Sequence, residues 1–302
     1  MLPPVVDAHF HWRDPLHHPY AVGTDGFDEN GNRGGAGVAP YLPDAYFADS
    51  DTIELCGLVH VEAEWDRADP AGETRWLHAL ARDTSTRGLP LVVVGWADFT
   101  APDVEALLAA HAAEPLTRGI RQILNRVDHR PDLCWADREY LESDVWRENY
   151  ALLGKYGLHF ELMCFAHQMG PLAALAARHP DIPVHLEHAG LPWDHTPEGR
   201  AAWRRGMQTL AALPHADVKI SGLGNTVPNW TVDSIRSYVL ETIDIFGTDR
   251  VAFGSNTPTD KKFSTIADIW AAFDTITAAF SPSERAAMFA GNTLRAYAFP
   301  GR

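Results

Sequence analysis

The order of hydrophobic and polar positions along the chain predicts eight buried strands. Each is a short, mostly apolar run, which is typical of parallel strands covered on both faces. The predicted strands are residues 5–12, 53–63, 91–98, 119–124, 159–165, 183–190, 217–222 and 250–256. Most of the intervals between them are long enough for a helix. Eight strand–helix units without a change in composition favour one closed (β/α)₈ TIM barrel, a single domain over residues 1–302, rather than an open sheet.

The ends of several intervening helices can also be predicted. Ser281 and Glu284 have the spacing of a capping box, with a proline between them in the first turn. Thr100 and Asp103 have the same spacing and predict a second helix start. Gly157 stands where the helix before it would end, because glycine adopts the left-handed conformation that terminates many helices.

Two polar segments interrupt the alternation of strands and helices. Residues 14–50 are rich in Gly, Pro, Asp and Asn and follow the first strand directly, and residues 128–143 have no regular pattern. Loops of this length are uncommon in a compact domain unless they cover or bind something. We therefore expect both segments to be lids over a site, with surface decoration as the alternative for the first.

Composition limits the partners of the chain. Its formal net charge of −15 argues against binding to nucleic acid or to an anionic membrane surface, because both attract clustered Lys and Arg. One or two Arg residues can still reverse the field inside a pocket, so an anionic small molecule is not excluded. The sequence lacks a basic segment followed by an apolar one at its start, and it lacks a long uncharged apolar stretch. We expect a cytoplasmic protein that acts on a small molecule; whether it forms a homo-oligomer is open.

Polar side chains recur at the ends of the predicted strands. His9 and His11 are two residues apart in an extended segment, so their side chains point the same way. Two converging imidazoles can hold a metal or donate paired hydrogen bonds to an oxyanion or a carboxylate. The candidates at strand ends are His9, His11, His60, Glu62, Arg121, His167, His188, Asn256 and, one turn later, Asp260. All strands of a barrel end on one rim, so these residues predict a common site. Hydrogen-bonded packing is the alternative for each alone, but each would then need its own buried partner.

Seven short motifs, in this order, resemble those of the amidohydrolase superfamily. They are Val6–Trp12, Val59–Ala63, Gly119–Gln122, Glu187–Gly190, Lys219–Gly222, Phe253–Pro258 and Gly291–Thr293. The resemblance is to the branch of lactonases related to 2-pyrone-4,6-dicarboxylate lactonase, L-fuconolactonase and 4-sulfomuconolactone hydrolase. It extends over essentially the whole chain. It implies a distorted barrel and the hydrolysis of a cyclic ester.

The resemblance also implies roles for individual residues. In the family pattern, the histidines at the positions of His9, His11 and His188 surround the substrate carbonyl, and an aspartate that ends strand eight activates the water. This chain has Asn256 at that position. An amide cannot accept a proton near neutral pH, so Asn256 can only orient. The base would then be Asp260 or a histidine (His188 or His167), unless a metal activates the water.

The cofactor is predicted as none or one divalent metal such as zinc. The family has metal-dependent and metal-independent members, so the resemblance leaves both open. A bound zinc would have His9, His11 and His188 as ligands, and such a site lowers the pKa of bound water to about 7.

The resemblance and the residue types together predict a mechanism. His9 and His11 polarise the lactone carbonyl, and water arrives from the side of His188 and Asp260. Arg121 would pair with a substrate carboxylate through its planar fork. The other predicted substrate contacts, including possible apolar walls of the pocket, are His60, Glu62, His167, Trp65, Trp12 and Trp230.

Two other functions remain possible at this point. A metal-dependent non-oxidative decarboxylase shares the barrel and the His-x-His strand, but it usually needs a carboxylate at the end of strand eight, where this chain has Asn256. A non-catalytic binding barrel that has lost its base is the second. Opening of a lactone releases a proton and simple binding does not, so a pH change with lactones separates the hydrolase from the binding protein.

Overall fold

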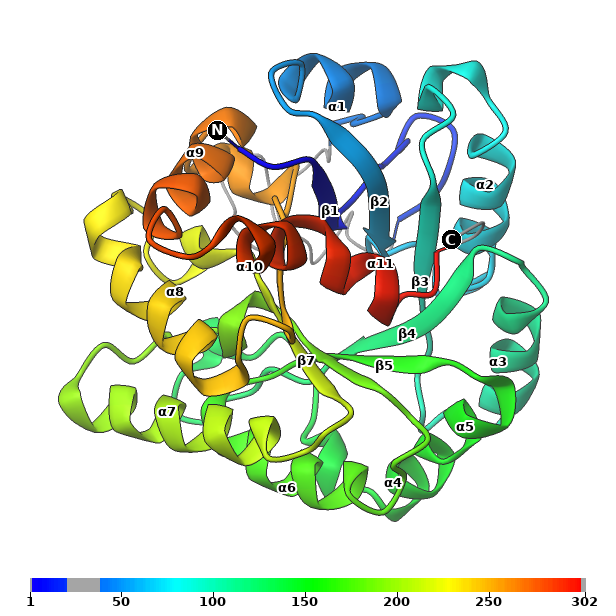
Figure 1. Cartoon of the computed structure of the whole chain (residues 1–302). Helices are drawn as coiled ribbons and strands as arrows, with labels where there is room; N and C mark the ends of the chain where they lie inside the picture. The colour runs from blue at the N-terminus through cyan, green and yellow to red at the C-terminus, as the bar shows by residue number, and fades with distance from the viewer. Residues whose placement is uncertain (1, 21–38, 300–302) are drawn as a thin grey trace.

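Eight parallel strands form a nearly closed barrel in the computed structural model, which describes residues 2–20 and 39–299 (Figure 1). Each strand pairs with the next one along the chain. The strands are β1 Val5–Phe10, β2 Leu55–Val61, β3 Leu91–Trp96, β4 Thr117–Ile123, β5 His159–Met163, β6 Val184–Leu186, β7 Ala216–Ile220 and β8 Val251–Phe253. The predicted single-domain TIM barrel and all eight strands are confirmed, although several strands are shorter than predicted.

The seam between β1 and β8 is closed by residues that follow β8. Asn256 N donates to His9 O at 2.7 Å, and His11 N donates to Thr257 O at 2.8 Å. Backbone pairing at the seam therefore takes place at the histidine end of β1, and it fixes this segment against the segment that carries Asn256.

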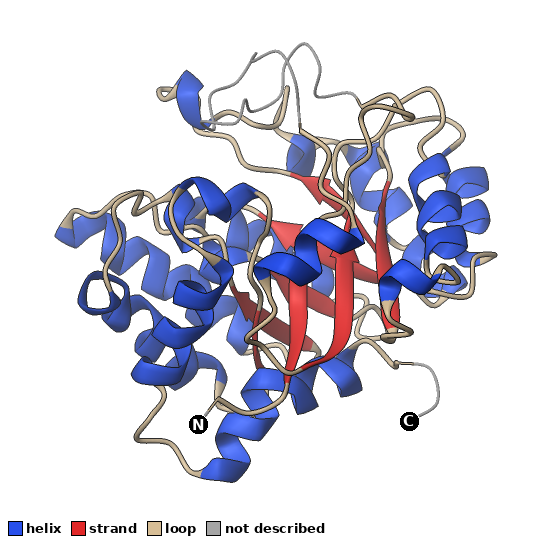
Figure 2. Ribbon diagram, turned by 90° about the horizontal axis from the view of Figure 1, so that it is seen from above, coloured by secondary structure: helices blue, strands red, loops and turns tan. Residues whose placement is uncertain are grey.

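Helices surround the strands on the outside (Figure 2). They are α1 Pro43–Asp49, α2 Gly72–Leu80, α3 Val104–Ala112, α4 Asp144–Tyr150, α5 Leu152–Tyr156, α6 Ala166–Ala176, α7 Pro197–Ala211, α8 Val232–Phe246, α9 Ile266–Ile276, α10 Pro282–Ala286 and α11 Asn292–Ala296. Outward-facing strand residues such as Leu58, Phe160 and Val218 are buried in the core that includes these helices. Among residues 2–20 and 39–299, no helix has the length and apolar character needed to cross a membrane.

The interior of the barrel changes from apolar to charged along the strands. Near the amino ends, valines such as Val6, Val59 and Val92 pack with Tyr297 and Phe299, which follow α11. In the view of Figure 1, α10 and α11 lie across this end of the barrel. Farther along the strands the interior side chains are acidic, basic or imidazole groups, and these form the site described below.

Two of the three predicted helix ends are confirmed. Ser281 caps α10 in a reciprocal capping box with Glu284, and Gly157 ends α5 with a φ of +64°. The predicted start at Thr100 is wrong, because α3 begins at Val104. Thr100 instead donates its backbone N–H and its hydroxyl to Asp98 Oδ1, at 2.8 and 2.7 Å, which closes a turn before the helix.

The two predicted lid segments are ordered where the structure describes them. Residues 21–38 of the first lie outside the described residues, and its later part forms α1. The second contains two short 3₁₀ turns, Pro131–Leu133 and Tyr140–Glu142. It is tied to the end of β4 through Asn125 O, which accepts from Trp135 N at 2.9 Å and from Ala136 N at 3.0 Å.

Candidate active site

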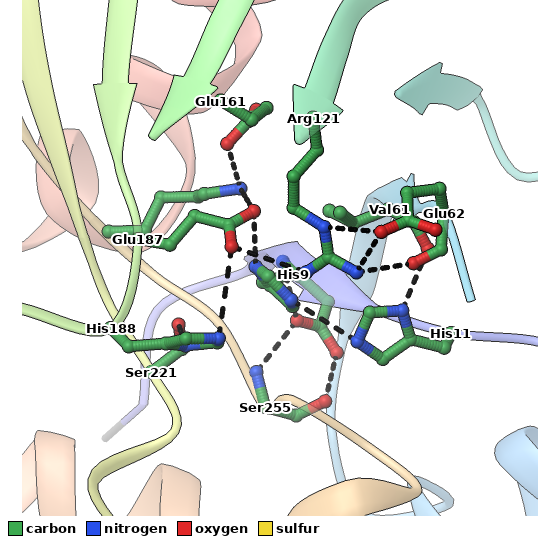
Figure 3. Close-up of polar contacts among 12 residues, drawn as sticks. His9, His11, Val61, Glu62, Arg121, Glu161, Glu187, His188, Ser221 and Ser255 are labelled. Atoms are coloured by element: carbon green, nitrogen blue, oxygen red, sulfur yellow. Dashed lines mark hydrogen bonds and ion pairs between the residues drawn. The ribbon is translucent and has the colours of Figure 1, made fainter. Parts of the chain in front are cut away.

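His9 and His11 meet at the carboxyl end of β1 (Figure 3). Their Nε2 atoms are 3.2 Å apart, and both side chains are buried. His11 Nδ1 lies 2.7 Å from the carbonyl oxygen of Val61. Burial, together with the nearby Lys219 and Arg121 respectively, lowers the pKa of His9 and of His11 well below the ordinary value, so both rings are neutral.

His188 lies beside His9, with 4.5 Å between the ring centroids. It follows β6 in a turn where His188, Ala189, Gly190 and Leu191 all have positive φ. Its Nδ1 is 2.9 Å from Ser221 Oγ, and a Cβ on the neighbouring Gly222 would lie 2.5 Å from the same nitrogen. The tight turn and the glycine therefore let this imidazole pack directly on the end of β7.

A series of buried ion pairs, the charge ladder, extends from the barrel interior to these histidines. Lys219 Nζ lies 2.5 Å from Glu161 Oε2 and 3.5 Å from Glu187 Oε1. Arg121 Nη1 donates to Glu187 Oε2 at 3.2 Å, and Arg121 Nε donates to Glu62 Oε1 at 2.9 Å. Burial opposes the ionisation of Glu62, but Arg121 outweighs it and holds the pKa of Glu62 below the ordinary value. Burial raises the pKa of Glu187, against the opposing effect of Arg121 and Lys219.

Asp260 is buried behind Asn256, whose backbone N–H donates to His9 O. Asn256 has a φ of +54°, and its Nδ2 donates to Asp260 Oδ1 at 2.8 Å. Burial raises the pKa of Asp260 to about 7, and the hydrogen bond from Asn256 opposes this shift.

A small cavity lies beside Asp260, between the ends of β7 and β8 and the helices α8 and α9. Its lining includes Asp260, Gly222 and Gly254, and it has room for about one water molecule. A Cβ on Gly254 would lie 2.7 Å from the Cβ of His9, and a Cβ on Gly222 would meet the His188 ring. The two glycines in the cavity wall are therefore packed against His9 and His188, and a water in the cavity would lie against a carboxyl group whose pKa is near neutral.

Asp7 fastens β1 to the segment that follows β8. It accepts from Ser255 N at 2.8 Å, from Ser255 Oγ at 2.6 Å and from Tyr46 OH at 2.9 Å. Burial raises the pKa of Asp7 to about 6 despite these hydrogen bonds. Two residues before His9, this carboxyl group holds the strand that presents the histidine pair.

The structure brings most of the predicted site residues together. Those at the barrel mouth are His9, His11, His188, Glu62 and Arg121, and Asn256 pairs its backbone with His9. Asp260 joins this group through its hydrogen bond with Asn256, and Trp230 lies with Asp260 in the wall of the small cavity. The prediction that Arg121 pairs with a substrate carboxylate needs correction. Glu62 and Glu187 already occupy its guanidinium, so no edge of the fork is left for a second carboxylate.

The other predicted contacts have packing or surface roles in the structure. His60 lies beside His11, with 6.2 Å between the ring centroids, but its Nε2 is 3.2 Å from Trp12 O and its ring packs on Phe10. His167 is exposed in the first turn of α6. Trp65 packs against Trp76, with 5.8 Å between the rings. Trp12 is also a core residue and packs on Phe10.

The sequence reasoning missed several residues of the site. Glu161, Glu187 and Lys219 were predicted only as parts of strands and were given no role in the site. The available signal was a charged residue at alternate positions of an otherwise apolar strand, as in Lys219 within Ala216–Ile220. In a barrel strand such a side chain must face the interior, where it requires a charged partner.

The hydrogen positions on the histidine pair leave two buried atoms unpaired. The oxygen of Val61 only accepts, so His11 carries its hydrogen on Nδ1 and its Nε2 is a bare acceptor. The contact between the two Nε2 atoms then places the hydrogen of His9 on Nε2. His9 Nδ1 is left bare, 3.5 Å from Glu187 Oε1, and neither atom has a hydrogen-bond partner among the described residues.

A divalent metal fits this arrangement. A cation shared by the two Nε2 atoms would move the hydrogen of His9 to Nδ1, where Glu187 can accept it, and so would satisfy both orphaned atoms. The ligand atoms of His9, Glu187 and His188 also lie within 4.8 Å of one another. Imidazole and carboxylate are ligands that suit zinc.

Comparisons with known proteins place the chain among well-studied barrels. The family model described as "Amidohydrolase" matches residues 6–299. "Uncharacterized protein y4mH" of Sinorhizobium fredii is 38% identical over 97% of this chain and 98% of that protein. An L-fucono-1,5-lactonase of Burkholderia multivorans is 28% identical over 86% of each chain.

Solved structures agree with this result. An amidohydrolase of Burkholderia multivorans with bound HEPES has a TM-score of 0.79 and 26% identity, covering 98% of this chain and 100% of that one. A second crystal form with bound zinc has a TM-score of 0.77 and 25% identity at the same coverage.

Proposed function

Because this chain belongs to the amidohydrolase family, we propose that it is a hydrolase that opens a lactone ring by adding water to the carbonyl carbon. The observation that carries the proposal is the meeting of three neutral imidazoles, His9, His11 and His188, at the mouth of the barrel. Asn256 joins this group to the buried carboxyl group of Asp260, because its backbone pairs with His9 and its amide donates to Asp260. The relatives that bear the name L-fucono-1,5-lactonase support a cyclic ester as the substrate.

Asp260 is the proposed general base. Its pKa of about 7 lies near neutral pH, where a base is both available and strong enough to take a proton. The pKa of His188 is well below the ordinary value because of burial and of the nearby Arg121, so His188 is the weaker base. Asn256 holds Asp260 by its amide and thus orients the carboxylate rather than replacing it.

The reaction then proceeds in two steps. Water adds through its oxygen to the lactone carbonyl carbon while one of its protons moves to Asp260. The carbonyl oxygen becomes an oxyanion that accepts a hydrogen bond from Nε2–H of His188, whose Nδ1 accepts from Ser221 Oγ. The intermediate collapses, the ring C–O bond breaks, and the proton on Asp260 goes to the leaving alkoxide. The new carboxylic acid ionises in water, so each turnover releases one proton.

If a metal is bound, we propose that His9, His11 and His188 hold it, with Glu187 accepting the hydrogen of His9 Nδ1. Such an ion supplies Lewis-acid polarisation of the carbonyl and stabilises the developing oxyanion. The zinc in the related Burkholderia structure supports testing this metal first.

The paired charges of the site favour a lactone that is uncharged near Arg121. Arg121 is held by Glu62 and Glu187, and Lys219 is held by Glu161 and Glu187. A substrate carboxylate placed there would meet acidic groups without a free cation. The same argument disfavours a decarboxylase, whose substrate is an anion.

The test is proton release from a panel of lactones in a pH-stat, with and without added zinc. Asp260→Asn is expected to lower turnover by about 100- to 10,000-fold, the usual contribution of a general base. The exchange variant Asn256→Asp with Asp260→Asn moves the carboxylate along the same hydrogen bond and is expected to recover activity. Asp51→Asn, in an exposed turn, is the matched control. Full activity of Asp260→Asn would exclude Asp260 as the base, and the failure of every lactone would exclude the function.

A further inference from the structure

Asn125 has a fully buried amide without a partner. Its relative exposure is 0%, and neither Oδ1 nor Nδ2 has a hydrogen-bond partner among residues 2–20 and 39–299. Leaving a buried polar group unpaired is destabilising, and few such groups occur in native proteins. Both a donor and an acceptor are unpaired on this one side chain, so it needs an explanation.

Asn125 lies just past the carboxyl end of β4, near the barrel mouth. Pairing of β4 with β5 continues past Ile123, because Leu124 N donates to Met163 O at 3.0 Å. Side chains alternate along a strand, so Asn125 falls on the same face as Ile123 and Arg121, one step nearer the rim than Ile123. Arg121 is part of the charge ladder beneath the histidines.

An apolar cluster lies at the same end of the barrel as Asn125. Val127, Met163, Phe165 and Leu191 form a buried cluster over the ends of β4, β5 and β6, and Ile123 packs against it. Leu191 belongs to the same tight turn as His188, so the cluster borders the catalytic side of the mouth. An amide among such side chains gains no hydrogen bond from them.

The second lid segment covers the same residue. Asn125 O accepts from Trp135 N and Ala136 N, which fixes residues 128–143 onto the end of β4. The backbone of Asn125 is therefore fixed to the second lid segment at the end of β4, and the alternation of side chains along the strand places its amide on the inner face of the barrel.

We propose that Asn125 is a specificity-determining residue that hydrogen-bonds hydroxyl groups of a polyhydroxylated lactone. The inference rests on the proposed function and adds the class of ring to it. An amide offers one acceptor and two donors, which match hydroxyl groups, each both a donor and an acceptor. A neutral polyol also agrees with the fully paired cations Arg121 and Lys219. A site built to bond a hydroxyl rejects analogues that lack it far more strongly than an apolar pocket can.

The experiment compares two six-membered lactones with the wild type and Asn125→Leu. L-fucono-1,5-lactone carries ring hydroxyls and δ-valerolactone has none. Leucine has the same branched outline as asparagine, with two larger methyl groups in place of the amide oxygen and nitrogen, so the variant removes both polar atoms. We expect kcat/KM for the hydroxylated lactone to fall on the order of 100-fold or more, and that for δ-valerolactone to change by less than about 5-fold. The thermal midpoint is expected to stay equal or to rise, because an unpartnered amide is removed.

The control is Asn149→Leu. Asn149 Nδ2 donates to Phe99 O at 2.8 Å, away from the histidines, so this variant loses a structural hydrogen bond and is expected to keep the wild-type ratio between the two substrates. Equal losses on both lactones in Asn125→Leu, or no loss on either, would overturn the inference and leave the proposed hydrolase standing.

A binding measurement separates this inference from the proposed function. If the wild type hydrolyses neither lactone, the function fails, and calorimetric titration with L-fucono-1,5-lactam, whose amide resists hydrolysis, decides the role of Asn125. Binding by the wild type that is lost in Asn125→Leu supports the inference. An absence of binding, or equal binding by both proteins, overturns it.

Discussion

Replacing Asp260 with asparagine tests the site through stability as well as through activity. The pKa of Asp260 is raised by burial from 3.8 to about 7. Between these two values the folded protein binds a proton that the unfolded chain has lost. The free energy of unfolding of the wild type therefore decreases as the pH rises from about 4 to about 7, and above pH 7 the penalty is constant.

The size of the effect follows from the shift. A rise from 3.8 to about 7 is about three pH units, and each unit corresponds to about 1.4 kcal/mol, so the ionised Asp260 costs up to about 4 kcal/mol of stability above pH 7. Asparagine carries no charge and still offers an oxygen to Asn256 Nδ2. At pH 5 the penalty for Asp260 already corresponds to about 1.2 of these pH units, and the rest develops at higher pH. The stability advantage of Asp260→Asn over the wild type is therefore expected to grow by about 3 kcal/mol between pH 5 and pH 8.5.

Urea unfolding at pH 5 and pH 8.5 measures this difference. The wild type, Asp260→Asn and the exposed control Asp51→Asn are compared, and the control is expected to track the wild type at both values. The same Asp260→Asn protein is expected to be nearly inactive, so the more stable protein is the poorer catalyst. An advantage that does not change between the two pH values would refute the reasoning, because it would mean that Asp260 is not a buried group that ionises near neutral pH.

Further predictions concern the charge ladder, the turn at His188 and the metal. Lys219→Met leaves buried carboxylates without their cation and is expected to lower the free energy of unfolding, measured in urea, by about 3–5 kcal/mol. Adding Glu161→Gln is expected to restore part of this loss, and no recovery would mean that the charges are not coupled. Gly222 has a φ of +60°, and Gly222→Ala puts a Cβ 2.5 Å from His188 Nδ1. Lactone turnover is therefore expected to fall about 10- to 100-fold, and unchanged turnover would argue against the need for a precise position of His188. His11→Asn removes one of the two facing Nε2 atoms and is expected to lower the zinc retained after dialysis, measured by elemental analysis; equal zinc in both proteins would contradict the assignment.

The fold could be predicted because barrel strands are buried on both faces and stand out as apolar runs. Their ends were predicted less well. The sixth predicted strand covers residues 183–190, but β6 ends at Leu186, since the chain turns to positive φ at His188. Residues beyond a strand end stay buried in the mouth of the barrel, so hydrophobicity alone does not mark where backbone pairing stops.

The site was predicted where spacing alone determines geometry, as for the His-x-His pair. It was predicted less well where geometry depends on the end of a strand. His60 faces outward because it still lies within β2, whereas Glu62 follows the strand and turns inward to Arg121. A shift of one residue changes the face on which a side chain lies. The partners of Lys219 come from other strands, and only closure of the barrel shows them.

The hydrogen bonds between His9, His11 and residues 256–257 join parts of the chain that are far apart in the sequence, and the histidines are synthesised before residues 256–257. A nascent polypeptide therefore carries the histidine pair long before it has the segment that holds it in place. Products of premature termination are expected to be catalytically silent, and two co-expressed fragments should regain turnover only when they associate across this junction.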